Sequence, residues 1–480
     1  MKGTDYSKQI KYELIAGIGL SFLAFVLLYL VVISDKNNSY EIEKNGQRYG
    51  RSEFVKYEGK ISVPVPSGGR YVLEDVDIST FRAVDSENNI DRSTLVVGLD
   101  KNHVYFGNIP VPDLNPSKLE VLGNGYYTDG TNTYFCSSYS QRNEDLSTSM
   151  ELLQHLVYIF SETKKPQSYI YPYKKIETNK RLQPVENLQY LATDGEKVYY
   201  RGEVLEKADL NTLKNVNEYN EYFADKENVY YKSKLLPIKN SGKLRVVSSE
   251  QGDEFLYDEA NGYVFMEDYS FDREKAPYKA LGNEGGHLNN LVFINKEGIY
   301  YYDNEEKQQE RAGDNIFKGK IEEINPNIFT DDENLYYFHA YDVWRKSKHD
   351  KGLDSRNTEI YSLGKKDAWE KIEDINNGVY GSIWQKGNKY YYFDNLGIHQ
   401  LINNTIYEIT DKETLAFLRN NHTKLRELIR SEKLIPVKGE KKVEIVVKRG
   451  GGFRDYYIIF LVSIAIVALF IHFKTKKIKY

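Results

Sequence analysis

A seven-residue pattern repeated along the chain constrains the fold more than any other feature of the sequence. Its clearest copies read DKNHVYF at residues 100–106 and DKENVYY at residues 225–231. Diverged copies start at Asp129, Asp194, Asp258, Asn295, Asp331 and Gln385. Most intervals between copies are about 29 to 37 residues, and two are longer. A tandem repeat of this length predicts an array of similar small units, each of which packs on its neighbours.

Each copy predicts a β-hairpin. A polar run of four residues precedes a β-branched or apolar residue and two aromatic residues. Aspartate at the first loop position accepts a hydrogen bond from the backbone two residues on and starts a turn. Asn or Gly at the fourth position, as at Asn228, Gly298 and Asn334, predicts a left-handed residue that closes a type I turn with a G1 bulge. Strand alternation places Val229 and Tyr231 on one face and Tyr230 on the other.

A second element recurs between the hairpins. The sequence DISTFRAV at residues 77–84 aligns with DLNTLKNV at residues 209–216. Aspartate is a favourable N-cap, and apolar residues four and seven places later share one helical face, so we expect a short helical connector here. Isolated hairpins are marginally stable, so the units must stack. The predicted fold is therefore mainly β, a tandem β-hairpin repeat array with short helical connectors.

The array could close into a propeller-like ring or remain an open, curved solenoid. A repeat of about 30 to 36 residues is short for a four-stranded propeller blade, which favours the open form. Both chain ends are expected at the same membrane, which suits a ring.

The Asp-Lys-x-x-Val-Tyr-Tyr hairpins, with the Asp-Leu-Asn connectors between them, resemble the DKNYY repeat family of bacterial cell-envelope proteins. Residues 100–106 and 225–231 match the pattern best, and recognisable copies extend over about residues 75–395. The resemblance implies a repeat protein of the bacterial envelope. It implies no established activity, and no functional residues are carried over from it.

Two uncharged runs predict transmembrane helices on either side of the array. Residues 14–33 are long enough to cross a bilayer, and a cleaved signal peptide is the alternative. Residues 456–473 form the second run. Lysines lie in both end segments, 1–13 and 474–480, so we expect both termini in the cytoplasm of a two-pass bacterial membrane protein. The large domain between the spans is then extracytoplasmic.

The rest of the chain divides by composition. Residues 36–70 are polar and end in a Pro/Gly-rich stretch, which is typical of a linker. The repeat domain is expected over residues 71–397, with a charged loop at about 341–370. Residues 410–454 are expected to form a helix, a strand and a Gly linker. A helical insert is expected at about 146–160, with one apolar face that covers an end or a side of the array, made of Leu146, Met150, Leu153, Val157 and Phe160.

No motif for catalysis or metal binding emerges. The net charge of −5 argues against nucleic acid as a partner, and the eight histidines are scattered. Residues 85–91 alternate oxygen-bearing side chains but lack the glycine and the glutamate of a calcium loop. The Gly-rich residues 281–287 lack the Lys-Ser/Thr of a phosphate loop. Cys136 is interpreted as a buried small residue. We therefore predict no enzyme, no catalytic or metal-binding residues and no cofactor.

Three functions remain open. The favoured one is a membrane-anchored, non-catalytic binding or scaffolding module of the cell envelope, with the lipid bilayer and an envelope protein as partners. The alternatives are a glycan- or peptidoglycan-binding protein that uses exposed tyrosines, and an envelope hydrolase with a dispersed carboxylate site. The strand tyrosines are interpreted mainly as packing residues. The recurring aspartates are interpreted as turn formers, at Asp100, Asp129, Asp194, Asp225, Asp258 and Asp331.

Overall fold

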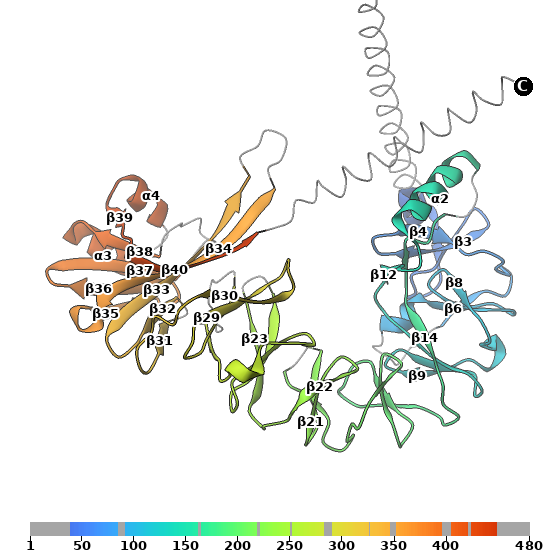
Figure 1. Cartoon of the computed structure of the whole chain (residues 1–480). Helices are drawn as coiled ribbons and strands as arrows, with labels where there is room; N and C mark the ends of the chain where they lie inside the picture. Colours follow the sequence, from blue (N-terminus) through green and yellow to red (C-terminus); the bar gives the residue numbers. More distant parts are fainter. Residues whose placement is uncertain are drawn as a thin grey trace, which may run out of the picture. The chain divides into compact units, whose positions relative to one another are not determined.

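A computed structural model describes most of the chain between residues 39 and 448, and the described residues fall into two compact units (Figure 1). The first unit contains the described residues up to Lys214 together with Lys232–Leu235. The second contains Asn215–Tyr231 and the described residues from Leu236 onward. The described stretches are residues 39–84, 92–161, 165–217, 221–249, 252–282, 290–325, 327–345, 352–395, 405–420 and 424–448.

Small antiparallel sheets follow one another in the first unit. The first two sheets are β1 (Gln47–Arg48), β2 (Val55–Tyr57), β3 (Lys60–Val65) and β4 (Gly69–Val72), then β5 (Arg82–Ala83), β6 (Val97–Leu99), β7 (Val104–Phe106) and β8 (Ile109–Val111). The third is β9 (Glu120–Gly123), β10 (Tyr126–Thr128), β11 (Thr133–Cys136) and β14 (Tyr173–Ile176), and the fourth is β15 (Gln183–Pro184), β16 (Leu191–Thr193), β17 (Val198–Tyr200) and β18 (Glu203–Leu205). Between β11 and β14 lie the two-stranded sheet of β12 (Gln141–Arg142) and β13 (Tyr169–Ile170) and the helix α2 (Thr148–Ser161).

The chain passes into the second unit at a sheet made of β19 (Lys214–Asn215), β20 (Tyr222–Ala224), β21 (Asn228–Tyr231) and β22 (Lys234–Lys239). Two similar sheets follow, β23 (Leu244–Ser248), β24 (Glu254–Asp258), β25 (Tyr263–Met266) and β26 (Tyr269–Ser270), then β27 (Lys279–Leu281), β28 (Val292–Ile294), β29 (Ile299–Asp303) and β30 (Gln308–Gly313).

The last two sheets have five strands each. One contains β31 (Glu322–Asn325), β32 (Ile328–Thr330), β33 (Asn334–Trp344), β34 (Leu353–Lys365) and β40 (Glu440–Lys448). The other contains β35 (Glu370–Ile375), β36 (Gly381–Lys386), β37 (Lys389–Asp394), β38 (Ile406–Ile409) and β39 (Leu434–Pro436), with α3 (Lys412–Asn420) and α4 (Leu425–Arg430) between its last two strands. Short 3-10 turns lie at Arg92–Val96, Pro116–Lys118, Arg273–Lys275 and Lys366–Ala368.

The repeating unit is larger than the predicted hairpin. Each recognised hairpin forms two neighbouring inner strands of a sheet, as β6 and β7 do around residues 100–103, and a further strand flanks it on either side. Because many of these strands have only two to four residues, four of them fit into a repeat that we considered short for a four-stranded blade. The interval 36–70, predicted as a linker, likewise contains most of the sheet β1–β4.

Neighbouring sheets share apolar cores, and successive residues of the central strands enter different cores. Tyr105 packs with residues of the preceding sheet, whereas Val104 and Phe106 pack with residues of the following one. Tyr126 and Tyr127 divide in the same way. This period-two alternation explains why both faces of the central strands are apolar or aromatic. Each sheet is therefore stable only with its neighbours, and the prediction of a mainly β stacked array is confirmed.

The connectors and the charged loop differ from expectation. The connector at residues 77–84 makes a single turn, in which the Thr80 amide donates to the Asp77 carbonyl, and then enters a strand. The charged segment 341–370, predicted as a loop, lies largely in β33 and β34, which pair along their length. The strand predicted near Val443 is β40, and it pairs with β34 in the preceding five-stranded sheet. Glycines 450–452 lie outside the described residues.

The predicted fold class and two-pass localisation need correction. Among the described residues no helix is long and apolar enough to span a bilayer. The longest of those with stated bounds, α2, has 14 residues and measures about 21 Å, against a hydrocarbon core of about 30 Å. The two expected spans, 14–33 and 456–473, lie outside the described residues, and we retain neither the flanking transmembrane helices nor the two-pass topology.

Candidate functional site

The recurring aspartates close the hairpin loops with their side chains. In the copy at residue 100, Asp100 Oδ1 accepts the amide protons of Asn102 and His103, both at 2.7 Å. Asp100 Oδ2 accepts the Asp77 amide of the connector at 2.7 Å and the Tyr105 hydroxyl at 3.2 Å. The carboxylate thus ties the loop, the connector and the next strand together.

Other copies use the same contacts. In the loop at residue 225, the amides of Glu227 and Asn228 donate to Asp225 Oδ1, and the hydroxyl of Tyr230 donates to Oδ2. Burial raises the pKa of Asp100, but the backbone amides outweigh it and hold the pKa below its ordinary value. These contacts agree with the interpretation as turn formers, and five of the six aspartates are buried, namely Asp100, Asp129, Asp225, Asp258 and Asp331.

The left-handed residue predicted at the fourth loop position is absent at Asn228, Asn334 and Gly298. Neither Asn228 nor Asn334 has a positive φ. The loop closes instead through the aspartate, whose amide donates to the carbonyl of the fourth residue, for example Asp225 N to Asn228 O at 3.0 Å. Asn228 is suited to its position because its side-chain amide donates to Asp225 Oδ2 at 3.2 Å.

The tyrosines of the central strands are packing residues. Tyr105, Tyr127 and Tyr230 are fully buried, and exposed fractions above a half occur among the described tyrosines at Tyr40 and Tyr139, both outside the strands. Cys136 is also fully buried and belongs to an apolar core. In the described part of the chain no group of three or more His, Cys, Asp or Glu residues could hold a metal ion. The calcium-like stretch 85–91 and most of the Gly-rich stretch 281–287 lie outside the described residues.

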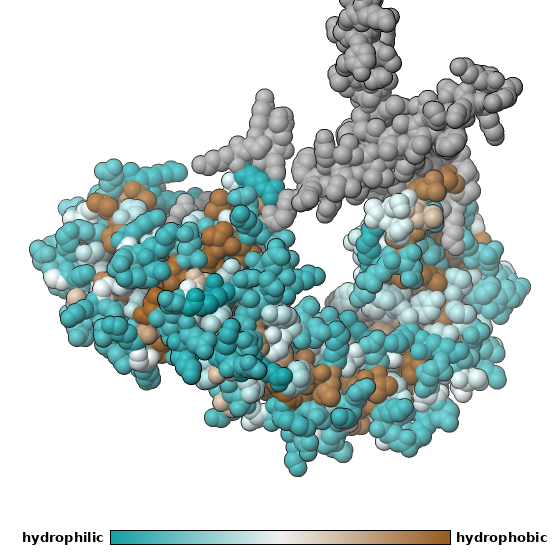
Figure 2. Space-filling view, in the orientation of Figure 1, coloured by the Kyte–Doolittle hydropathy of each residue, from teal (hydrophilic) through white to brown (hydrophobic). Residues whose placement is uncertain are grey.

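The feature that stands out is the orientation of α2. We expected its apolar face to cover the array, but Met150, Leu153 and Val157 are 48%, 52% and 49% exposed. These residues are three and four apart, so they form one row along the helix. Figure 2 shows hydrophobic residues on the surface at α2 in the first unit. An apolar row turned to solvent is unusual for a helix packed on its own domain.

A polar contact joins another side of α2 to the two-stranded sheet. The Glu151 carboxylate, on another side of the helix from the apolar row, pairs with Arg142 of β12 at 2.6 Å. Burial raises the pKa of Glu151, but hydrogen bonds from Ser168 and Arg142 hold the pKa below its ordinary value. His155, one turn later, lies 4.0 Å from the same carboxylate. The ion pair attaches the polar side of α2 to the two-stranded sheet, which leaves the apolar row outside.

A groove of about 440 Å³ runs beside this row, within the size range of ligand pockets. It lies between α2 and the segment that enters β13, and Lys165 is the one charged residue among the described residues that line it. These described lining residues are Asn143, Leu146, Leu153, Gln154, Val157, Lys165 and Gln167. The groove therefore joins an apolar wall to a polar wall with one cation.

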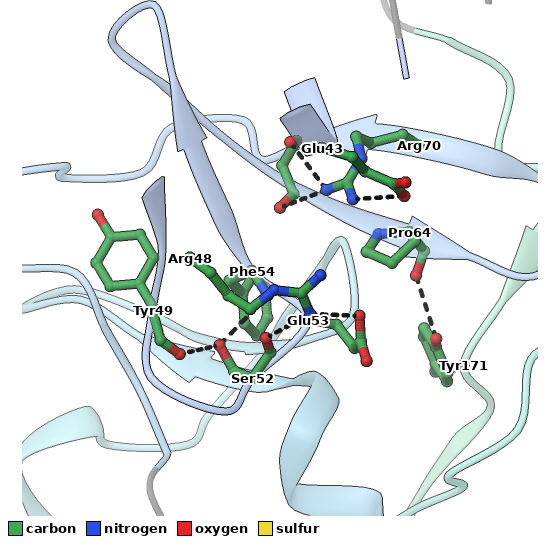
Figure 3. A network of polar contacts seen from close by, with 10 residues as sticks. Glu43, Arg48, Tyr49, Ser52, Glu53, Phe54, Pro64, Arg70 and Tyr171 are labelled. Carbon is green, nitrogen blue, oxygen red and sulfur yellow. Dashed lines mark hydrogen bonds and ion pairs between the residues drawn. The ribbon is translucent and has the colours of Figure 1, made fainter. Parts of the chain in front are cut away.

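The wall opposite α2 is fastened to the first sheet. The Tyr71 hydroxyl of β4 donates to the Pro166 carbonyl at 2.9 Å. The Tyr171 hydroxyl donates to the Pro64 carbonyl of β3 at 3.1 Å (Figure 3). In the same view, the buried guanidinium of Arg70 pairs with Glu43 at 3.3 Å. Both walls thus have defined anchors in described elements, which favours a preformed groove.

Sequence reasoning found this helix but expected all of its apolar face to be covered, whereas three of the five residues are exposed. Leu146 is half-buried, and the side chain of Phe160 lies outside the described ones. The three-to-four spacing gives the face and not the direction in which it points. The contrary indication was present in Glu151 and His155, an acid and a possible cation one turn apart on another side of the helix, close in sequence to Arg142. The groove itself has no local sequence pattern, because its walls come from separate segments.

The comparisons bear on the first unit most. A model described as the DKNYY family matches residues 54–234. The predicted resemblance to the DKNYY repeat family is confirmed over these residues. The DKNYY match includes α2 and all the residues that line the groove. No curated protein matches the chain.

Among solved structures, the crystal structure of the tricorn protease is similar at 10% identity and a TM-score of 0.14. The match covers 84% of this chain and 44% of that one, so the chain spans less than half the length of that protein. At this TM-score the likeness supports no conclusion about fold or activity.

Proposed function

We propose that this DKNYY-family protein is a non-catalytic repeat module that binds another protein through the apolar row of α2 and the groove beside it. The observation that supports the proposal is the reversed orientation of α2, whose ion-paired Glu151 lies against its own domain while Met150, Leu153 and Val157 remain accessible. Accessible apolar rows beside a groove are typical of protein-binding surfaces. The stacked sheets provide a rigid support for this surface.

The other candidate functions receive less support from the described residues. A glycan platform needs exposed aromatic faces, and the strand tyrosines are used between sheets. A hydrolase needs carboxylates that face a substrate, and the recurring aspartates already accept hydrogen bonds from their own loops. Protein binding instead uses the apolar row of α2 and the groove beside it.

Site-specific photocrosslinking of the full chain tests the proposal. A crosslinker at Gln154, on the groove, is expected to capture a distinct protein in the native cells. Purified, that protein should bind the wild type and lose at least tenfold in affinity to Val157→Asp, since a carboxylate in an apolar interface costs more than about 1.4 kcal/mol. The matched control is Val379→Asp, because Val379 is 58% exposed in the second unit.

Equal binding of the captured protein to Val157→Asp and to Val379→Asp would overturn the proposal. Crosslinking of the chain only to its own copies would also overturn it, since the occupant would then be a second copy. Circular dichroism of both variants verifies that each has the wild-type fold before affinities are compared.

A further inference from the structure

We propose that the outer edge of β40 pairs with the same edge of a second copy of the chain, in an antiparallel register centred on Val446. The two copies then share one continuous sheet. The surface concerned is separate from that of the proposed function, because β40 lies in the second unit and α2 in the first. The length, the backbone and the side chains of β40 each support this pairing.

β40 has the longest outer edge among the described sheets. It contains nine residues and is the outermost strand of its sheet, with β34 on its inner side (Figure 1). In the described part of the chain no strand pairs with its other edge. The remaining outermost strands of the described sheets do not exceed six residues, the length of β22, β30 and β35. A long unpaired edge is a template for a further strand, so β40 is where one is expected to add.

The backbone groups on this edge belong to alternate residues of β40. The Phe338 amide of β33 donates to the Asn327 carbonyl on the side of β32, so the residues next to Phe338 bond to β34. Regular pairing carries this alternation across β34 to β40, where the residues with buried side chains bond to β34. The exposed residues therefore direct their amides and carbonyls to the outer edge, namely Glu444, Val446 and Lys448.

The side chains of these residues complement a second copy of themselves. Charges on an edge strand ordinarily discourage pairing. In an antiparallel pair centred on Val446, however, Glu444 of each copy lies opposite Lys448 of the other, and two-fold symmetry produces this pair twice. The two Val446 side chains, each 37% exposed in the single chain, then cover each other. Both the charged and the apolar side chains thus find suitable neighbours.

The neighbouring registers are less favourable. A pair centred on Ile445 places Lys442 opposite Lys448, and like charges directly opposite are destabilising. A pair centred on Glu444 places two carboxylates against each other. Its Glu440–Lys448 contacts lie beyond Lys442, where a bulge interrupts the pairing of β40 with β34. The charges therefore select the register centred on Val446.

The same pattern identifies the occupant as a second copy. A strand of another protein would have to carry the matching sequence by chance, whereas a second copy carries it by symmetry. Residues 444–448 extend over about 17 Å, so the contact is small beside the interfaces of stable complexes. We therefore expect a dimer that forms and separates readily, for which covalent trapping is the suitable assay.

Disulfide trapping in the full chain tests the pairing. In this register the two Val446 Cα atoms are about 5.5 Å apart, within reach of a disulfide. On oxidation with copper phenanthroline, Val446→Cys should form a covalent dimer about tenfold faster than Ile435→Cys does. Ile435 is the matched control, because it is a 46% exposed aliphatic residue on the outermost strand β39. The native Cys136 is buried and should form no dimer.

Charge exchange tests the register in the chain that contains Val446→Cys. Glu444→Lys or Lys448→Glu alone places like charges opposite each other twice, which should slow dimer formation about tenfold. Both changes together restore opposite charges, so the rate should return to within about twofold of the starting rate. A change that only disturbed the fold of β40 would not be reversed in this way.

Three outcomes would count against the pairing. Equal rates of dimer formation in Val446→Cys and Ile435→Cys overturn it. A double exchange that is as slow as either single exchange overturns the register. Capture of a different protein by Val446→Cys overturns the assignment of a second copy as the occupant. Protein binding at α2 is tested independently, through Val157→Asp.

Discussion

Replacement of Asp100 by alanine should destabilise the second sheet more than any surface change nearby. The side chain accepts four hydrogen bonds, from the amides of Asp77, Asn102 and His103 and from the Tyr105 hydroxyl. Asp100 is 3% exposed, so water replaces these contacts poorly. At about 1 kcal/mol for each bond, the free energy of unfolding of this part should fall by about 4 kcal/mol.

Two milder variants each remove only some of the four hydrogen bonds. Tyr105→Phe removes one hydrogen bond and should cost about 1 kcal/mol. Asp100→Asn keeps the Oδ1 acceptor, as Asn295 does for the amides of Glu297 and Gly298 in a later repeat. It replaces the Oδ2 acceptor of two bonds by a donor, so a loss of about 2 kcal/mol is expected. Lys101→Ala is the control, because that side chain is 61% exposed and its ion pair with Asp77 should contribute at most about 1 kcal/mol.

Hydrogen exchange of the full chain, followed by mass spectrometry, measures these losses locally. In Asp100→Ala, protection of peptides from β6 and β7 should fall by up to about three orders of magnitude, and protection of β36 and β37 should not change. The reasoning is refuted if Lys101→Ala lowers protection as much as Asp100→Ala does, or if the loss is equal in all sheets.

Three further predictions follow from the described contacts. Tyr126→Phe should lower the midpoint of thermal unfolding by several degrees, because the Tyr126 hydroxyl bridges the Gly202 amide and the carbonyls of Tyr190 and Tyr199; an unchanged midpoint would contradict this role. Acid should destabilise the array below about pH 4, because the folded protein lowers the pKa values of Asp100, Asp129, Asp194 and Asp331. The stability that these carboxylates contribute is complete above the ordinary carboxyl pKa and is lost as the pH falls through the folded pKa values. An unfolding midpoint that is constant from pH 5 to pH 3 would contradict this prediction. Glu359→Gln should weaken the pairing of β40 with β34, because Glu359 pairs with Lys441 at 3.2 Å and accepts a hydrogen bond from the Tyr361 hydroxyl at 2.6 Å. The expected result is faster amide hydrogen exchange that is confined to β34 and β40.

The repeat pattern predicted the central hairpins because all their determinants are local. Asp225 and Tyr230 are five residues apart, and the loop between them closes on the aspartate itself. The flanking strands were missed because strands as short as Arg82–Ala83 carry no recognisable periodicity and exist only by pairing with a central strand.

The groove could not be predicted for a similar reason. Its walls are set by contacts between segments far apart in the sequence, such as Tyr71 with Pro166 and Tyr171 with Pro64. Met150 points outward while the next residue, Glu151, pairs with Arg142, and the spacing of the apolar residues does not reveal this direction. A charged pair within nine residues of sequence is a usable indication for similar inserts in other repeat proteins.

The return of β40 to the sheet of β34 has a mechanical consequence. The chain leaves that sheet at Lys365, builds β35–β39 with α3 and α4, and comes back to pair with β34 from Ser355 to Ser362. Tension applied beyond Lys448 therefore reaches β40 and its neighbour first. The sheet β35–β39 lies in the chain between β34 and β40, and these two strands are paired. It therefore carries none of that force until β40 has separated from β34.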